Sequence, residues 1–307
     1  MTRRVPFDLP NLPSASGAIV LALLMAGPLV PGQAAAQGLL PGGPPAASPS
    51  GDIARHEPIF GRGPRTLWQG GYGIGVGIER EAAHREQHWA LDYHLSYGFT
   101  ERWMGLVELH QESLGEGAAF GSFGNLRVRT KYRFYMNNVP GGVYHAAVVG
   151  GVSLPSGTAE HSPDATDVVG GLSGAYEGRR WLLFGTARYR LNTQGDTGIE
   201  RGDVVLYDVA LGIRPVLTGY YQPDVVLMGE LNGEIFQSSS LAGHGHAEED
   251  HHGQVGPGGH RLLAGFGAWL TYRNWAVKPG IQVPLYNGLQ GGRELDYHGI
   301  LEVEIHF

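Results

Sequence analysis

The feature that most constrains this chain is an alternation of polar and apolar residues with a period of two. Within residues 123–136, Leu126, Val128, Tyr132 and Phe134 are apolar, and the residues between them are mostly polar or basic. Neighbouring side chains of a β-strand point to opposite faces, so a strand that is wetted on one side shows this period. Eleven further segments follow the pattern less perfectly: 69–79, 89–97, 102–112, 143–154, 166–177, 180–192, 203–214, 224–237, 260–272, 274–285 and 296–307. We therefore predict an all-β protein of about twelve strands.

The composition supports this fold class and excludes several functions. Fifty of the 307 residues are glycine, which disfavours helices. The chain has no cysteine, which excludes disulfides, Cys-ligated zinc and a cysteine nucleophile. Its net charge of -7, without a basic block, argues against a nucleic-acid partner.

The first 36 residues have the pattern of a secretory signal peptide. Arg3 and Arg4 give a positive start, the run 17–26 is apolar, and residues 34–36 are three alanines. The alternative, a single transmembrane anchor, is less favoured because the apolar run is short and prolines interrupt the residues after it. We therefore expect an exported protein.

Two segments follow the signal peptide. Residues 37–66 are rich in Gly, Pro, Ala and Ser and show no periodicity, so we expect them to form a flexible periplasmic leader. Residues 67–307 contain all the alternating segments and are expected to form the folded domain.

The connections between the predicted strands alternate between two length classes. Longer ones are expected near 81–87, 113–122, 155–165, 193–202, 238–259 and 286–295, and shorter ones near 99–101, 137–142, 178–179, 215–223 and 273. Transmembrane barrels combine short periplasmic turns with longer outer loops. A soluble sandwich would explain the alternation but not the two length classes. We predict a transmembrane up-and-down antiparallel β-barrel in the outer membrane of a Gram-negative bacterium, in contact with outer-membrane lipid.

The last strand carries a second sign of the outer membrane. Tyr297, Leu301, Val303, Ile305 and the terminal Phe307 share one face. This arrangement resembles the C-terminal signature that outer-membrane proteins present to the barrel-assembly machinery, which we therefore expect as a partner.

Three stretches resemble the phenol-degradation meta-pathway outer-membrane family. They are Gly-Asn-Leu-Arg-Val-Arg-Thr-Lys-Tyr-Arg-Phe at 124–134, Val-Ser-Leu-Pro-Ser-Gly at 152–157 and Tyr-Gly-Phe-Thr-Glu-Arg-Trp at 97–103. The resemblance covers residues 69–307. It implies a barrel of twelve or a similar number of strands that takes up a small organic solute, aromatic or hydrophobic in character. It carries no catalytic residues to transfer.

Charged residues occupy the strand positions opposite to the apolar ones. An arginine at the bilayer midplane costs about 2–4 kcal/mol, so these residues are expected to line the interior. The candidate pore-lining residues are Arg127, Arg129, Lys131, Arg133, Arg188, Arg190, Glu230, Glu234, Glu302 and Glu304. Basic and acidic walls can form a narrow pore with a transverse field, or they can pair across the barrel and close it. Both alternatives stay open.

The most unusual connection is the predicted outer loop 238–259, which is rich in histidine. Imidazoles and carboxylates suit Zn²⁺, Cu²⁺ or Ni²⁺. The candidate ligands are His244, His246, His251, His252 and the nearby His260. The alternative is a solvated loop without a specific role. We expect no required cofactor.

The leading functional hypothesis is a channel or transporter-like barrel, not an enzyme. The alternative is a plugged barrel that binds or senses a divalent metal through the histidine-rich loop. A remote alternative is an outer-membrane lipid hydrolase, because His94 and Ser96 have the spacing of a base and its nucleophile. Both residues fall on the predicted inner face, away from lipid.

Overall fold

The computed structural model describes the part of the chain that forms the predicted domain. The described residues are 57–83, 86–113, 120–158, 165–195, 199–219, 222–241, 258–289 and 295–307. The chain divides into two units, residues 1–48 and 49–307, and every described residue belongs to the second. The predicted signal peptide and residues 37–56 of the predicted leader lie outside the described residues.

All the regular elements of the described residues are β-strands. They are β1 (Tyr72–Ala83), β2 (Glu86–Thr100), β3 (Trp103–Ser113), β4 (Phe120–Phe123), β5 (Leu126–Val139), β6 (Gly142–Leu154), β7 (Asp167–Gly178), β8 (Trp181–Leu191), β9 (Ile199–Glu200), β10 (Val204–Ile213), β11 (Asp224–Phe236), β12 (Ser240–Leu241), β13 (Gly259–Tyr272), β14 (Trp275–Asn287) and β15 (Tyr297–His306). Among the residues that the structure describes, no helix has the length and hydropathy needed to span a bilayer.

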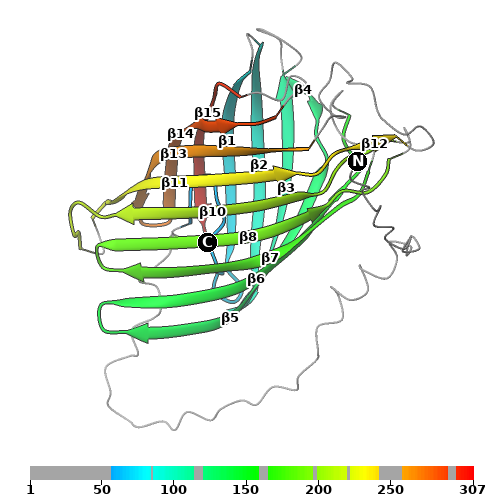
Figure 1. Ribbon diagram of the computed structural model, residues 1–307. Helices are drawn as coiled ribbons and strands as arrows, with labels where there is room; N and C mark the ends of the chain where they lie inside the picture. Colours follow the sequence, from blue (N-terminus) through cyan, green and yellow to red (C-terminus); the bar gives the residue numbers. More distant parts are fainter. Residues whose placement is uncertain are drawn as a thin grey trace, which may run out of the picture. The chain divides into compact units, whose positions relative to one another are not determined.

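The long strands form one closed antiparallel barrel (Figure 1). Each pairs with its neighbours in chain order, and β15 returns to pair with β1. The short strand β4 and the long strand β5 pair with different parts of β3, so they occupy one position in the wall. This gives a barrel of twelve strands and confirms the predicted fold class. The two-residue strands β9 and β12 pair only with each other.

The period of two separates a lipid-facing surface from the lumen. On β1, Ile74 and Val76 are exposed, whereas the glycines on either side of them are buried. On β2, Leu95 is 51% exposed and its neighbour Ser96 is completely buried. An apolar exposed face over a polar interior is the reverse of a soluble protein and is typical of a membrane barrel.

One predicted connection is wrong. Residues 81–87 were expected to form a longer loop, but β1 and β2 stay paired as far as Ala83 and Glu86. Most residues of this stretch are charged or polar, so their composition resembles that of a loop although the strands stay paired.

The predicted flexible leader is also wrong for its last ten residues. Residues 57–66 lie inside the barrel, where Ile59 and Pro64 are buried. Ile59 packs in an apolar cluster with Leu182, Phe184, Met228 and Trp269, which come from the three wall strands β8, β11 and β13. The cluster buries apolar side chains of both the segment and the wall away from water. This burial stabilises the position of the segment.

Candidate functional site

The segment of residues 57–66, which we call the lumen segment, is held by one glutamate of the wall. The carboxylate of Glu230 on β11 accepts hydrogen bonds from the backbone N–H groups of Ile59, Phe60 and Gly61, the last two at 3.1 Å. Glu230 itself is 4% exposed. A buried carboxylate needs such partners, because an unpaired charge away from water is costly.

Arg62 extends the same anchorage across the lumen. Its backbone N–H donates to Asp208 Oδ1 at 3.3 Å, and its guanidinium donates to Glu108 Oε1 at 2.8 Å. Its carbonyl accepts hydrogen bonds from the hydroxyls of Ser173 and Thr186. The Glu108 carboxylate raises the pKa of Arg62 above its ordinary value, so the guanidinium stays charged.

A cavity of about 780 Å³ lies beside the lumen segment, and charged residues line much of it. The structure brings seven of the ten predicted pore-lining residues to this cavity: Arg127, Arg129, Lys131, Arg188, Arg190, Glu302 and Glu304. The first five come from β5 and β8 and form a basic wall, while the two glutamates come from β15.

The other three predicted residues face inward or lie at the rim without lining the cavity. Glu230 binds the lumen segment, as described above. Glu234 pairs with Arg261 at 2.5 Å. Arg133 donates to the carbonyl oxygen of Glu101 at 2.7 Å, near a register shift in β5 that ends the simple alternation.

The basic wall is only partly neutralised. Arg129 pairs with Glu108 at 3.0 Å, Lys131 with Glu57 at 2.5 Å and Arg188 with Asp208 at 3.1 Å. Within the described part of the chain, Arg127 and Arg190 have no carboxylate within 4.0 Å. Two guanidiniums are therefore available to a solute in the cavity.

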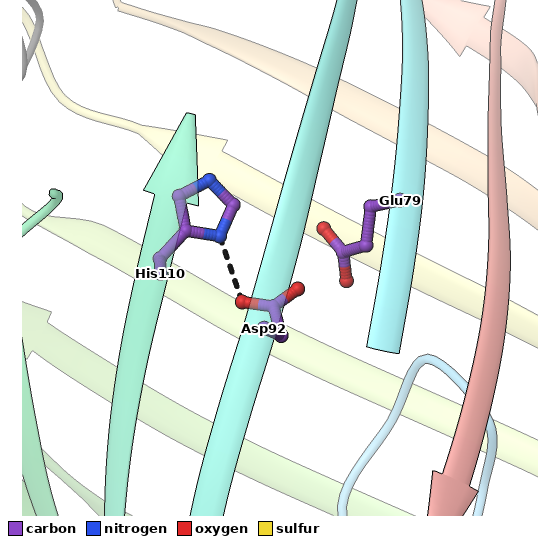
Figure 2. A group of neighbouring side chains, drawn as sticks. All are labelled: Glu79, Asp92 and His110. Carbon is purple, nitrogen blue, oxygen red and sulfur yellow. Dashed lines mark hydrogen bonds and ion pairs between the residues drawn. The ribbon is translucent and has the colours of Figure 1, made fainter. Parts of the chain in front are cut away.

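The strands that adjoin β5 in the wall, β1 to β3, carry further inward carboxylates and an imidazole, which were not among the predicted pore-lining residues. Glu79 on β1, Asp92 on β2 and His110 on β3 lie on adjacent strands with their side chains directed toward one another (Figure 2). His110 Nδ1 lies 2.7 Å from Asp92 Oδ1. All three occupy strand positions that face inward, and this position is the only feature of the sequence that points to them.

A second group of the same kind lies further along this wall. His94 Nε2 lies 3.8 Å from Glu302 and 3.5 Å from Glu304. Both glutamates also pair with the ammonium of Lys278, the second of them at 3.2 Å.

The hydrolase alternative gains no geometric support. Ser96 Oγ donates to the Gly73 carbonyl oxygen at 3.4 Å, whereas His94 faces two glutamates. The two residues share the inner face but make no hydrogen bond with each other, so His94 is not placed as a base for Ser96.

The predicted histidine-rich site is mostly outside the described residues, as His244, His246, His251 and His252 all are. His260 is described, and it belongs to the wall. Its Nε2 lies 2.8 Å from the hydroxyl of Tyr207, and its ring lies between those of Tyr207 and Tyr286. His260 therefore stands in a cluster of aromatic rings.

Comparison with known proteins identifies the family. The family model described as "Putative MetA-pathway of phenol degradation" matches residues 105–272, more than half of the chain. The protein belongs to this family. No curated protein matches it in sequence.

Solved structures support the fold. An outer membrane channel from Pseudomonas putida F1 matches with a TM-score of 0.59 and 12% identity, covering 80% of this chain and 98% of that one. The translocator domain of the autotransporter NalP from Neisseria meningitidis matches with a TM-score of 0.38 and 13% identity, covering 77% and 88%. LpxR from Salmonella typhimurium matches with a TM-score of 0.38 and 10% identity, covering 76% and 99%. The first of these matches supports an outer-membrane type of barrel.

Proposed function

We propose that this barrel lies in the outer membrane and carries a small organic solute through its lumen, past the lumen segment. The observation that carries the proposal is the cavity of about 780 Å³ bounded by charged walls. A barrel that was merely closed by its own charges would pair them all, whereas Arg127 and Arg190 face the cavity without an acidic partner among the described residues.

The family supports the class of solute. Its description refers to phenol degradation, which favours an aromatic molecule. Two unpaired guanidiniums further favour a solute that carries a carboxylate or phenolate, because arginine binds such oxygens through several parallel hydrogen bonds. We therefore expect small aromatic anions to enter more readily than aromatic cations.

The test is single-channel recording in planar bilayers, using the refolded chain that begins at residue 37. We expect discrete openings, and larger ones from a variant that lacks residues 57–66, because the lumen segment occupies part of the cross-section. A benzoate gradient should give a current carried by the anion. If both proteins fold but neither conducts, the proposal fails.

A further inference from the structure

Two carboxylates of the lumen wall, Glu79 and Asp92, lie close together, and neither forms an ion pair with a lysine or arginine of the described residues. Single ligand atoms from Glu79, Asp92 and His110 all lie within 4.8 Å of one another. No lysine or arginine nitrogen of the described residues is within 4.0 Å of either carboxylate, and the ion pairs that Glu79 and Asp92 make are with histidines. Two carboxylates at this separation repel each other, so a proton or a bound cation stabilises the group.

In the second group, His94, Glu302 and Glu304, the repulsion between the carboxylates is relieved by a lysine. Glu302 and Glu304 also lie beside a histidine, but Lys278 donates its ammonium to both. The Lys278 ammonium therefore takes the place that a bound cation would occupy in that group. The group of Glu79, Asp92 and His110 has the same kind of donors without one.

The donor atoms match a transition metal better than an alkaline-earth ion. Zinc accepts both imidazole nitrogen and carboxylate oxygen as donors, and three such ligands would leave a fourth position for water. Ligands about 2.1 Å from a tetrahedral Zn²⁺ are about 3.4 Å apart, so only small side-chain rotations are needed. Asp92 Oδ2 is buried and has no hydrogen-bond partner, which leaves this oxygen available.

A neighbouring histidine lies within ion-pair distance of one of the proposed ligands. His298 Nε2 lies 3.4 Å from Glu79 Oε2, on the side away from Asp92's strand. Such outer contacts orient ligating carboxylates and are usual around metal sites. The ring of His298 also contacts Phe60 of the lumen segment, with 5.5 Å between the ring centroids.

We propose that Glu79, Asp92 and His110 form a binding site for a divalent transition-metal ion, of the Zn²⁺ type, on the lumen wall. The proposed site uses no residue of the histidine-rich loop 238–259, and it does not depend on whether the barrel conducts. All three residues line the cavity, so the bound ion would lie at its surface.

The experiment measures Zn²⁺ binding by isothermal titration calorimetry in detergent micelles. The starting protein is the chain from residue 37 with His244, His246, His251 and His252 replaced by alanine, so that the loop cannot contribute. We expect one Zn²⁺ per chain. Asp92→Asn and His110→Gln should each weaken binding at least about tenfold, because each removes a ligand. Glu79→Gln serves as a third variant if one of these does not fold, as judged by heat-modifiable migration in gels.

The matched control is His94→Gln, which changes the histidine of the group that Lys278 neutralises. It should bind Zn²⁺ as the starting protein does. Visible spectra of the Co²⁺ form should show four-coordination in the starting protein and lose it in Asp92→Asn. The proposal is overturned if the starting protein binds no Zn²⁺, if Asp92→Asn and His110→Gln bind normally, or if His94→Gln weakens binding to the same extent.

Discussion

At the scale of the residue, Glu230 stands out because one carboxylate accepts three successive backbone N–H groups. Burying an unpaired carboxylate would cost several kcal/mol, and burying three unpaired N–H groups would add to this. The hydrogen bonds between the carboxylate and the N–H groups remove both of these costs. The wall and the lumen segment are therefore stable in contact and less stable apart.

We expect Glu230→Gln to release the lumen segment. The carboxamide keeps the size of the side chain but directs an NH₂ group at backbone donors. Hydrogen bonds to charged groups contribute about 1.5–3 kcal/mol, so the released population should rise about ten- to a hundredfold. Trypsin should then cleave faster after Arg62 and Arg65. Glu234→Gln, whose carboxylate pairs with Arg261 instead, is the control and should be cleaved at the original rate. Equal rates in the two variants would contradict this role of Glu230.

Arg127 and Arg190 give a second expectation at this scale. Replacing both by glutamine removes two positive charges from the cavity wall, so the permeability of chloride relative to potassium should fall by at least about twofold. Reversal potentials in a salt gradient measure this ratio. Arg214→Gln, which breaks a pair with Asp224 outside the cavity, should leave it unchanged. A drop of the same size in this control would mean that overall charge, not the wall, sets selectivity.

The sequence predicts which residues face inward but not which of them meet. Parity alone places Asp92 and His94 on the inner face. The contact between Asp92 and His110 depends on the register between β2 and β3, which pairs these two residues directly. No composition or spacing rule gives that register, so the group of Glu79, Asp92 and His110 could not be found from the sequence.

At the scale of the element, the barrel is closed by its first and last strands. Tyr72 and Phe307 exchange backbone hydrogen bonds of 3.1 and 2.8 Å at the end of this pairing. Their rings stack with centroids 5.1 Å apart on the lipid-facing side. The last residue therefore completes the closure, which gives the terminal phenylalanine a structural role beside its predicted role in assembly.

A pair of variants separates these two roles. Phe307→Ala and Tyr72→Ala each remove the stack, which contributes about 0.5–1.5 kcal/mol. Both should lower the stability of the purified barrel to a similar extent in urea titrations in vesicles. Only Phe307→Ala should also slow folding in vesicles that contain the assembly machinery, because only it alters the C-terminal signature. If the two variants assemble equally fast, the predicted signature has no part in assembly.

The strands were predictable because each carries its own alternation, and the errors occur where the alternation stops being informative. Arg133 is the last residue of β5 before a register shift, and it binds the Glu101 carbonyl oxygen instead of lining the cavity. The hairpin of β1 and β2 continues through residues that look like a loop. Both features depend on how two neighbouring strands pair, which the alternation within a single strand does not reveal.

At the scale of the whole molecule, the lumen is shaped by a part of the chain that precedes the barrel. Residues 57–66 show no periodicity, so their sequence resembles a flexible leader. Their position comes from partners more than 100 residues away, such as Glu230 and Thr186. Long-range contacts of this kind leave no local signal, which is why this prediction was wrong for these residues.

The histidine-rich loop stays a prediction at this scale. Deletion of residues 243–253 should leave single-channel conductance unchanged, because none of the described cavity residues belongs to that stretch. The deletion should also remove any Zn²⁺ or Cu²⁺ binding beyond the lumen site, as measured by equilibrium dialysis. Loss of conductance in a folded deletion variant would instead place the loop at the mouth of the pathway.

The way in which Glu230 holds the lumen segment has a consequence for variation within the family. Its three partners are main-chain N–H groups, so the contact does not depend on which side chains the segment carries at 59 and 60. Position 61 is restricted because a Cβ there would collide with Asp208 Oδ1, and position 59 is restricted by the apolar cluster in which Ile59 packs. The main-chain contact itself therefore tolerates exchange of the apolar residues at 59 and 60, whereas the packing around Ile59 decides which of them fit the wall. A foreign peptide should be graftable into the same position only if it has an apolar residue in the first place and glycine in the third.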